Sequence, residues 1–228
     1  AIVAARKRGV KAWIETVAPY LTLDRSCAEL PDFEGAKYVM SPPIRAKEHG
    51  DFLWKCLADG TVDTVGTDHA PFDFATQKHM GHPEKAVDAN MQPTGKGANF
   101  TLIPNGIPSV EERVKLLYTE GVCRGRIDLQ TLVRCASTRA AKIFGLYPRK
   151  GTIAQGSDAD LVVWDPAWKG KISASTHSMA TDYSAFEGRE VIGRAELVTV
   201  RGKIMVRDGA WTGDAGWGEF LARTPHTS

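Results

Sequence analysis

The sequence predicts an α/β fold in which the end of a parallel (β/α)8 barrel, namely its last two strands and helices, precedes a small β-sheet module. Three observations support this. Short apolar runs at residues 10–17 and 61–67 flank a helical pattern at residues 45–58, which is the strand–helix–strand order of a parallel sheet. Polar residues follow the second run directly, and barrels carry their chemistry at such strand ends. After residue 148, the chain consists of short β-rich runs separated by Gly, Asp and Pro.

The helices are predicted from apolar spacing and from their end signals. The pattern at residues 45–58 ends before Gly60. Ser109 and Glu112 have capping-box spacing, which predicts a helix over residues 109–118 with Ser109 as its N-cap. Asp128 and Gly145 delimit another helix over residues 128–144. The expected apolar face of this last helix comprises Leu129, Leu132, Val133, Ala136, Ala140 and Ile143.

The predicted elements divide the chain into three regions. Two strands cannot close an eight-stranded barrel, so we expect residues 1–148 to be part of a barrel in a longer protein. Residues 149–210 are expected to form part of a small composite β domain, whose sheet should be open and have an unpaired edge. Its short strands are predicted at residues 151–153, 159–164, 190–192, 197–201 and 203–207, with a reversal at 201–203. Residues 211–228 are expected to form a C-terminal tail.

Composition excludes several classes of protein. Lys and Arg total 29, Asp and Glu total 27, and the basic residues are dispersed, so we expect no nucleic-acid partner. No apolar run approaches the roughly 20 residues that a membrane span needs, so we expect no membrane association. The four cysteines are widely spaced and form no Cys-x-x-Cys pair. Free thiols and a cytoplasmic location are the corresponding expectations.

Asp68 is the main candidate for chemistry. It follows the predicted strand at 61–67, where a carboxylate can bind a metal ion or transfer a proton to a leaving nitrogen. A turn or capping role is the alternative, because Asp is common where loops begin. Neighbouring His69 fits a structural role better than metal binding. His79 and His82 lie in the long polar segment 72–106, a loop of functional or disordered length, and their spacing does not predict a metal site.

Five segments, in the same order, resemble the dihydropyrimidinase/hydantoinase family of amidohydrolases. The segments containing Ser-Pro-Pro and Pro-Asn-Gly are the more specific ones, whereas the last is common to many amidohydrolases. The segments are residues 15–21 (ETVAPYL), 37–45 (KYVMSPPIR), 66–72 (GTDHAPF), 103–113 (IPNGIPSVEER) and 150–162 (KGTIAQGSDADLV).

The resemblance implies a metal-dependent hydrolase of cyclic amides. In this family a barrel holds two divalent metals, usually zinc, and a bridging hydroxide attacks the ring amide. By resemblance, Asp68 would be both a metal ligand and the catalytic proton shuttle. Ser41 and Asn105 would bind the substrate's ring amide through their backbone groups. The partner would be a small cyclic amide, either a dihydropyrimidine or a 5-substituted hydantoin, and the intact enzyme would be a homo-oligomer, a tetramer or a dimer.

The sequence also departs from the family pattern. The family's His-x-His pair, metal-bridging lysine and two later histidines would precede Ala1, and Ala70 replaces a cysteine that is frequent in the family. We therefore expect this chain alone to bind zinc weakly and to lack activity. One alternative is a non-catalytic scaffold like the collapsin response mediator proteins, but these relatives lack the counterparts of Asp68 and Asn105. A second alternative is a complete small protein made only of this half, which would expose strand edges.

Overall fold

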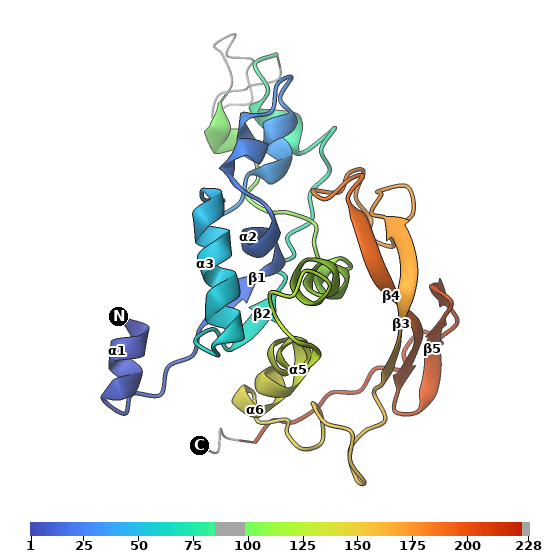
Figure 1. The fold of residues 1–228 in the computed structure, drawn as a ribbon. Coiled ribbons are helices and arrows are strands. Elements are labelled where there is room, and N and C mark those ends of the chain that lie inside the picture. The colour runs from blue at the N-terminus through green and yellow to red at the C-terminus, as the bar shows by residue number, and fades with distance from the viewer. Residues whose placement is uncertain (85–98, 225–228) are drawn as a thin grey trace.

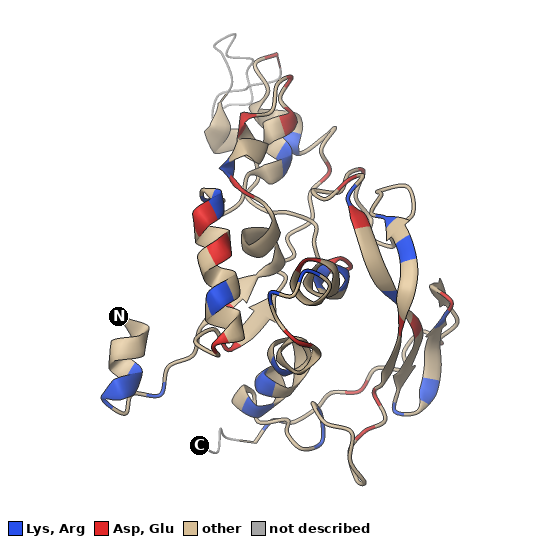
Figure 2. Cartoon of the chain, viewed as in Figure 1, with Lys and Arg blue, Asp and Glu red and all other residues tan. Residues whose placement is uncertain are grey.

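A computed structural model describes residues 1–84 and 99–224 of the chain. Helices and a short parallel sheet make up the first part of the chain, and a curved antiparallel sheet lies beside them (Figure 1). Basic and acidic residues are interspersed along the ribbon in both parts (Figure 2). Within the described ranges, no helix has both the length and the apolar character required to cross a bilayer.

The parallel pair predicted from the sequence is confirmed. Strand β1 (Glu15–Val17) lies parallel to β2 (Thr64–Gly66), with Thr16 opposite Val65. Helix α3 (Lys47–Ala58) connects them, and the short helix α2 (Ala18–Thr22) follows β1 directly. Both strands are shorter than expected, because residues 10–14, 61–63 and 67 do not belong to them. Side chains replace the β ladder there, since Arg6 donates to the Ala12 carbonyl oxygen and the Asp63 carboxylate accepts from the Ile14 N–H.

The remaining helices confirm some end signals and contradict others. The side chain of Asp128 accepts from the Thr131 N–H, as predicted, and Gly145 ends the helix with φ of 68°. The capping box at Ser109 does not form. Residues 110–112 form a turn, the helix starts only at Arg113, and Ser109 donates its hydroxyl to the carbonyl oxygen of Thr67 at 2.7 Å.

The remaining helices are α1 (Ile2–Lys7), α4 (Arg113–Leu116) with π segment Leu117–Val122, and α5 (Leu129–Val133) and α6 (Arg139–Ile143), joined by π segment Arg134–Thr138. Short 3₁₀ helices occupy Arg25–Glu29, Glu34–Tyr38, Lys78–Gly81 and Phe100–Leu102.

The predicted apolar face of the 128–144 helix was partly wrong. Leu129 and Val133 are 54% and 53% exposed, whereas Leu132, Cys135 and Ala141 are buried. The π segment between α5 and α6 has a wider turn than an α-helix, so it changes which positions face the core. A regular period of 3.6 residues therefore predicted Ala140 on the buried face, whereas the buried alanine is Ala141, one residue later.

The second sheet is antiparallel and open, in the order β3-β4-β5-β6. Its strands are β3 (Val162–Lys171), β4 (Glu190–Val200), β5 (Lys203–Arg207) and β6 (Ala210–Trp211). The predicted reversal at 201–203 is confirmed, with Arg201 and Gly202 at positive φ between β4 and β5. Among the described strands, β3 and β6 each pair on one side only, as expected for an open sheet.

Several strand limits in this sheet were predicted incorrectly. Residues 151–153 form no strand, residues 190–192 and 197–201 belong to the single strand β4, and β6 was not predicted. Strand β3 continues past Pro166 because its pairing with β4 is interrupted between Asp165 and Lys169. Proline is tolerated at such an irregularity, since its missing N–H is not needed there.

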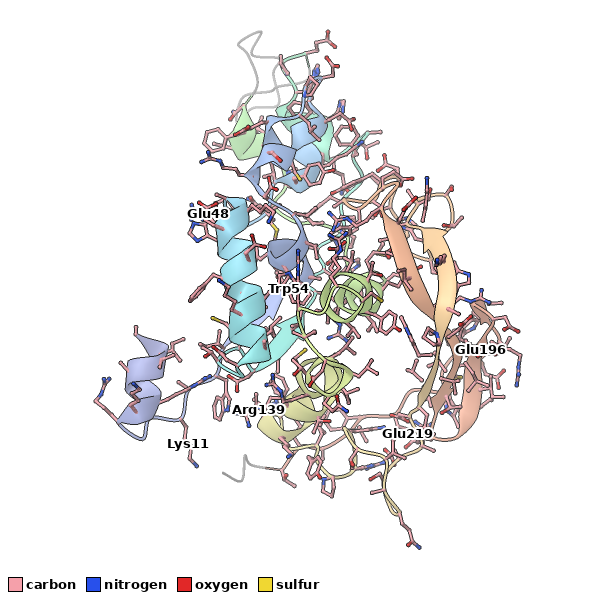
Figure 3. All side chains as sticks on the ribbon, viewed as in Figure 1. Lys11, Glu48, Trp54, Arg139, Glu196 and Glu219 are labelled. Atoms are coloured by element: carbon pink, nitrogen blue, oxygen red, sulfur yellow. The ribbon has the colours of Figure 1, made fainter. Side chains whose placement is uncertain are left out.

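Two buried clusters hold the fold together. The first joins β1 and α2 to the second sheet, through residues such as Val17, Ile107 and Val191. The second lies between α3, β2 and the α5–α6 helix and includes Leu57 and Trp54. The indole of Trp54 points inward from α3 (Figure 3) and donates to the carbonyl oxygen of Leu21 at 2.8 Å. The four cysteines, Cys27, Cys56, Cys123 and Cys135, have free thiols, as the sequence predicted.

Candidate functional site

The ends of the two parallel strands lie at one edge of their sheet, and Asp68 follows β2 there. Its side chain is exposed and its backbone has φ of 49°, in the left-handed region. Asp enters this region more readily than most residues, and such conformations are concentrated at functional sites. The backbone therefore turns sharply where the predicted catalytic carboxylate stands.

Tyr20 links the Asp68 region to the turn that contains Ser41. Its hydroxyl donates to the carbonyl oxygen of Pro42 at 2.6 Å. Burial raises the pKa of the Tyr20 phenol, and the nearby negative charge of Asp68 raises it further, while Arg45 opposes the change. Tyr20 is thus a neutral hydrogen-bond donor that lies near the Asp68 charge and holds the peptide between Pro42 and Pro43. Ser41 itself is exposed.

The Asn105 segment pairs with the chain just after Asp68. His69 and Ile107 form a parallel β-bridge, and the Ala70 N–H donates to the Ile107 carbonyl oxygen at 3.3 Å. Gly106 approaches Ala70 so closely that a Cβ atom at position 106 would lie 2.5 Å from that of Ala70. Only glycine permits this approach. Asn105, which precedes it, is exposed.

The Ser41 and Asn105 segments also contact each other, because the Gly106 N–H donates to the Val39 carbonyl oxygen at 3.0 Å. The three predicted site residues therefore stand on three connected segments. Their neighbours make the connecting contacts, and the side chains of Asp68, Ser41 and Asn105 are left exposed. Buried Lys78 also contributes, because it donates to the carbonyl oxygens of Val39, Pro104 and Gly106. Neither Lys78 nor Tyr20 was predicted from the sequence as a site residue.

Two cavities lie near this region but do not include Asp68. One, of about 160 Å³, adjoins the Ser41 turn and is bounded by Tyr20, Pro42 and Arg45. The other, of about 460 Å³, lies between Lys37 and the loop that carries Asp182 and Tyr183. Asp68 itself is exposed, and the smaller cavity adjoins the neighbouring Ser41 turn.

The histidines around the site make structural contacts. The Nδ1 atom of His69 accepts from the backbone N–H groups of Ser109 and Val110, at 3.1 and 3.3 Å, and burial lowers its pKa. The rings of His79 and His82 stack 5.2 Å apart, and both contact Phe33 edge-on. Across residues 1–84 and 99–224, no group of three or more His, Cys, Asp or Glu side chains is arranged to hold a metal ion. Since a catalytic zinc usually takes about three protein ligands, Asp68 alone does not fit that requirement.

Known proteins resemble the chain over its whole length. Residues 43–205 match the model of the amidohydrolase family. A D-hydantoinase of Geobacillus stearothermophilus is 47% identical over 225 residues, which cover 99% of this chain and 45% of that protein. A D-hydantoinase of Ralstonia pickettii is 43% identical, with 97% and 45% covered. This chain thus spans about half the length of the curated relatives it matches.

Solved structures agree with this comparison. A D-hydantoinase crystal structure superimposes with a TM-score of 0.90 and 47% identity, covering 100% of this chain and 46% of that one. The dihydropyrimidinase from Brevibacillus agri gives a TM-score of 0.90 at 44% identity, with the same coverage. An L-hydantoinase from Arthrobacter aurescens gives 0.80 at 30% identity, covering 96% of this chain and 45% of that one.

Proposed function

Because the chain belongs to the amidohydrolase family, we propose that it is the C-terminal portion of a metal-dependent cyclic amidase. The intact enzyme would hydrolyse the ring amide of dihydropyrimidines or 5-substituted hydantoins. The observation that carries the proposal is the meeting of three segments at one sheet edge, where Asp68, Ser41 and Asn105 are all exposed. This proposal accords with the hydantoinases and dihydropyrimidinase that the chain resembles.

In this proposal Asp68 acts in proton transfer, and Ser41 and Asn105 act in substrate binding. The Asp68 carboxylate would accept a proton from the attacking water and pass it to the ring nitrogen as the amide C–N bond breaks, which is general acid–base catalysis. Backbone groups of Ser41 and Asn105 hold the ring amide, and Tyr20 keeps the Ser41 turn in place through Pro42. The family implies a metal cofactor, and we propose two zinc ions. The described residues do not supply their ligand set, and we propose that the remaining ligands belong to the part of the enzyme that precedes this chain.

The same proposal covers the organisation of the protein. Residues 1–148 would complete a (β/α)8 barrel together with the preceding half of the enzyme. Residues 149–210 would join a composite β domain, and residues 211–228 would form its tail. We further propose a cytoplasmic homo-oligomer, a tetramer or a dimer. The presence of Asp68 and Asn105 favours an enzyme over a non-catalytic scaffold.

The test is a hydrolysis assay on dihydrouracil and hydantoin with added zinc. The full-length protein is expected to turn over at least one substrate, and the 228-residue chain alone neither. Replacing Asp68→Asn in the full-length protein should lower kcat by about 10²–10⁴-fold, the usual contribution of a positioned acid–base group. Asn has nearly the same size but cannot accept the proton, and Asp51→Asn on the surface of α3 is the matched control.

Two outcomes would contradict the proposal. Zinc-dependent turnover by the isolated chain would show that it needs no further ligands. Near-normal turnover by the Asp68→Asn enzyme, with an unchanged circular dichroism spectrum, would remove Asp68 from catalysis.

A further inference from the structure

Lys78 is a buried charge without a carboxylate partner among the described residues. Its side chain has 0% exposure, although lysine is almost never fully buried unless it is paired. The three donors of its ammonium group instead bind three backbone carbonyl oxygens. These belong to Val39 at 2.9 Å, Pro104 at 2.6 Å and Gly106 at 2.7 Å. Such a group is costly to bury, so its three bonds must be geometrically well made.

The three acceptors belong to the two segments that carry Ser41 and Asn105. Val39 lies two residues before Ser41, and Pro104 and Gly106 flank Asn105 on both sides. The Val39 carbonyl oxygen also accepts from the Gly106 N–H. One ammonium group thus fixes both segments against each other, from beneath the exposed edge.

These bonds determine which way the Asn105 backbone points. In a trans peptide the C=O and the following N–H point in opposite directions. Because the Pro104 carbonyl points at Lys78, the Asn105 N–H points away from it. Because the Gly106 N–H points at Val39, the Asn105 carbonyl points away from Val39. Neither Asn105 group has a hydrogen-bond partner among the described residues, so Asn105 presents one donor and one acceptor at an exposed position.

We propose that Lys78 is a positioning residue. It fixes the direction of the backbone donor and acceptor with which the Ser41 and Asn105 segments hold the substrate's ring amide. A cyclic amide presents the complementary pair, an N–H and a C=O. This inference rests on the proposed function for its substrate. If Lys78 only stabilised the fold, replacing it would speed amide hydrogen exchange alike in all regions and would leave the Michaelis constant unchanged.

The test compares Lys78→Met, which has similar length but no donors, with Lys37→Met. Lys37 is a half-buried lysine at the start of the Ser41 segment whose side chain pairs with Glu34 and lies over the Phe74 ring, away from the carbonyl groups that bind Lys78. Amide hydrogen exchange on the full chain is expected to become about tenfold faster at Gly106 and Ala70 in Lys78→Met, the size of one lost hydrogen bond. The buried Val62 amide, bonded to Cys56, should not change, and neither should any of the three amides in Lys37→Met.

The kinetic measurement uses the full-length enzyme. Lys78→Met should raise KM for dihydrouracil or hydantoin by about tenfold while kcat changes by less than about threefold, as expected when binding alone is lost. An unchanged KM, unchanged exchange at Gly106, or equal acceleration at Val62 would overturn the proposal.

Two further results keep the inference separate from other failures. If Lys78→Met does not fold, exchange in the unmodified chain decides the question. The Gly106 amide must then be about as slow as the Val62 amide, and exchange at the rate of an open loop would overturn the proposal. If the full-length protein hydrolyses neither substrate, the proposed function fails, while the exchange measurement still decides whether Lys78 holds the two segments.

Discussion

Asp63 offers a sharp test of what holds the first half of the chain together. It lies directly before β2 and is 2% exposed. One carboxylate oxygen accepts from the Ile14 N–H at 2.8 Å and pairs with Arg6 of α1. The other accepts from Arg139 of α6 at 2.9 Å (Figure 3 labels Arg139). In Asp63→Asn, the amide nitrogen would face a donor on one of these sides, and both guanidinium groups would lose their counter-charge.

The expected cost follows from burial. Removing one partner of a fully buried ion pair costs about 3–5 kcal/mol. Arg6 and Arg139 remain 27% and 40% exposed, so water recovers part of this, and we expect Asp63→Asn to lower the free energy of unfolding by about 2–3 kcal/mol. Urea unfolding followed by circular dichroism measures the loss. The control is Asp51→Asn, which breaks the exposed Lys47–Asp51 pair on α3 and should cost about 0.5 kcal/mol or less. A loss no greater than that of the control would refute the reasoning.

Two further predictions concern buried side chains. Leu57→Ala, at a position with 0% exposure in the cluster beneath α3, should lower the free energy of unfolding by about 3 kcal/mol with an unchanged urea m-value; a loss below about 1 kcal/mol would contradict close packing there. Burial lowers the pKa of Lys78 to about 8 from 10.5, so the unfolded chain keeps this proton to higher pH than the folded chain does. The stability of the unmodified chain relative to Lys78→Met should therefore rise between about pH 8 and 10.5, by up to about 3 kcal/mol, in urea titrations across that range. If this stability difference stays constant or falls as pH rises, the hydrogen bonds to the three carbonyl groups raise the pKa of Lys78 at least as much as burial lowers it.

The parallel pair could be predicted because its signals are local and agree with one another. Apolar strands, the helix spacing at 45–58 and the Gly60 stop all favour the same strand–helix–strand unit, and β1, α3 and β2 follow it. The limits of the elements were less accurate because they depend on partners elsewhere in the chain. Residues 10–14 have a strand-like sequence, yet the Arg6 side chain bonds the Ala12 carbonyl oxygen and the Asp63 side chain bonds the Ile14 N–H.

The failed capping box has the same cause. Ser109 and Glu112 have suitable spacing, but the Ser109 hydroxyl binds the Thr67 carbonyl oxygen and its N–H binds His69. Glu112 is 1% exposed and pairs with Lys115 at 3.1 Å, and burial raises its pKa above the ordinary value. Tertiary contacts near the proposed site therefore outcompete a local motif whose own contribution is about 1 kcal/mol.

The candidate site shows which polar residues a sequence can reveal. Asp68 was predicted from its place after a strand and from the family resemblance, Ser41 and Asn105 were predicted from the resemblance alone, and all three are exposed. Lys78 was missed because a lysine in a long polar segment carries no local sign that it will be buried. Only the folded chain brings the Val39, Pro104 and Gly106 carbonyl groups around it.

This difference has a physical basis. For a polar residue that binds a substrate, residue type and place in the chain are constrained together, and a motif records both. A buried polar residue must instead satisfy its own donors or acceptors, and backbone carbonyl groups of any sequence can do that. Lys78 therefore leaves no motif at Val39 or Pro104, even though it orients the peptides on either side of Asn105. The partners of Lys78 are all carbonyl oxygens close to exposed polar residues. This arrangement supports the inference that the backbone there is oriented to bind a substrate, and Lys78→Met tests that inference directly.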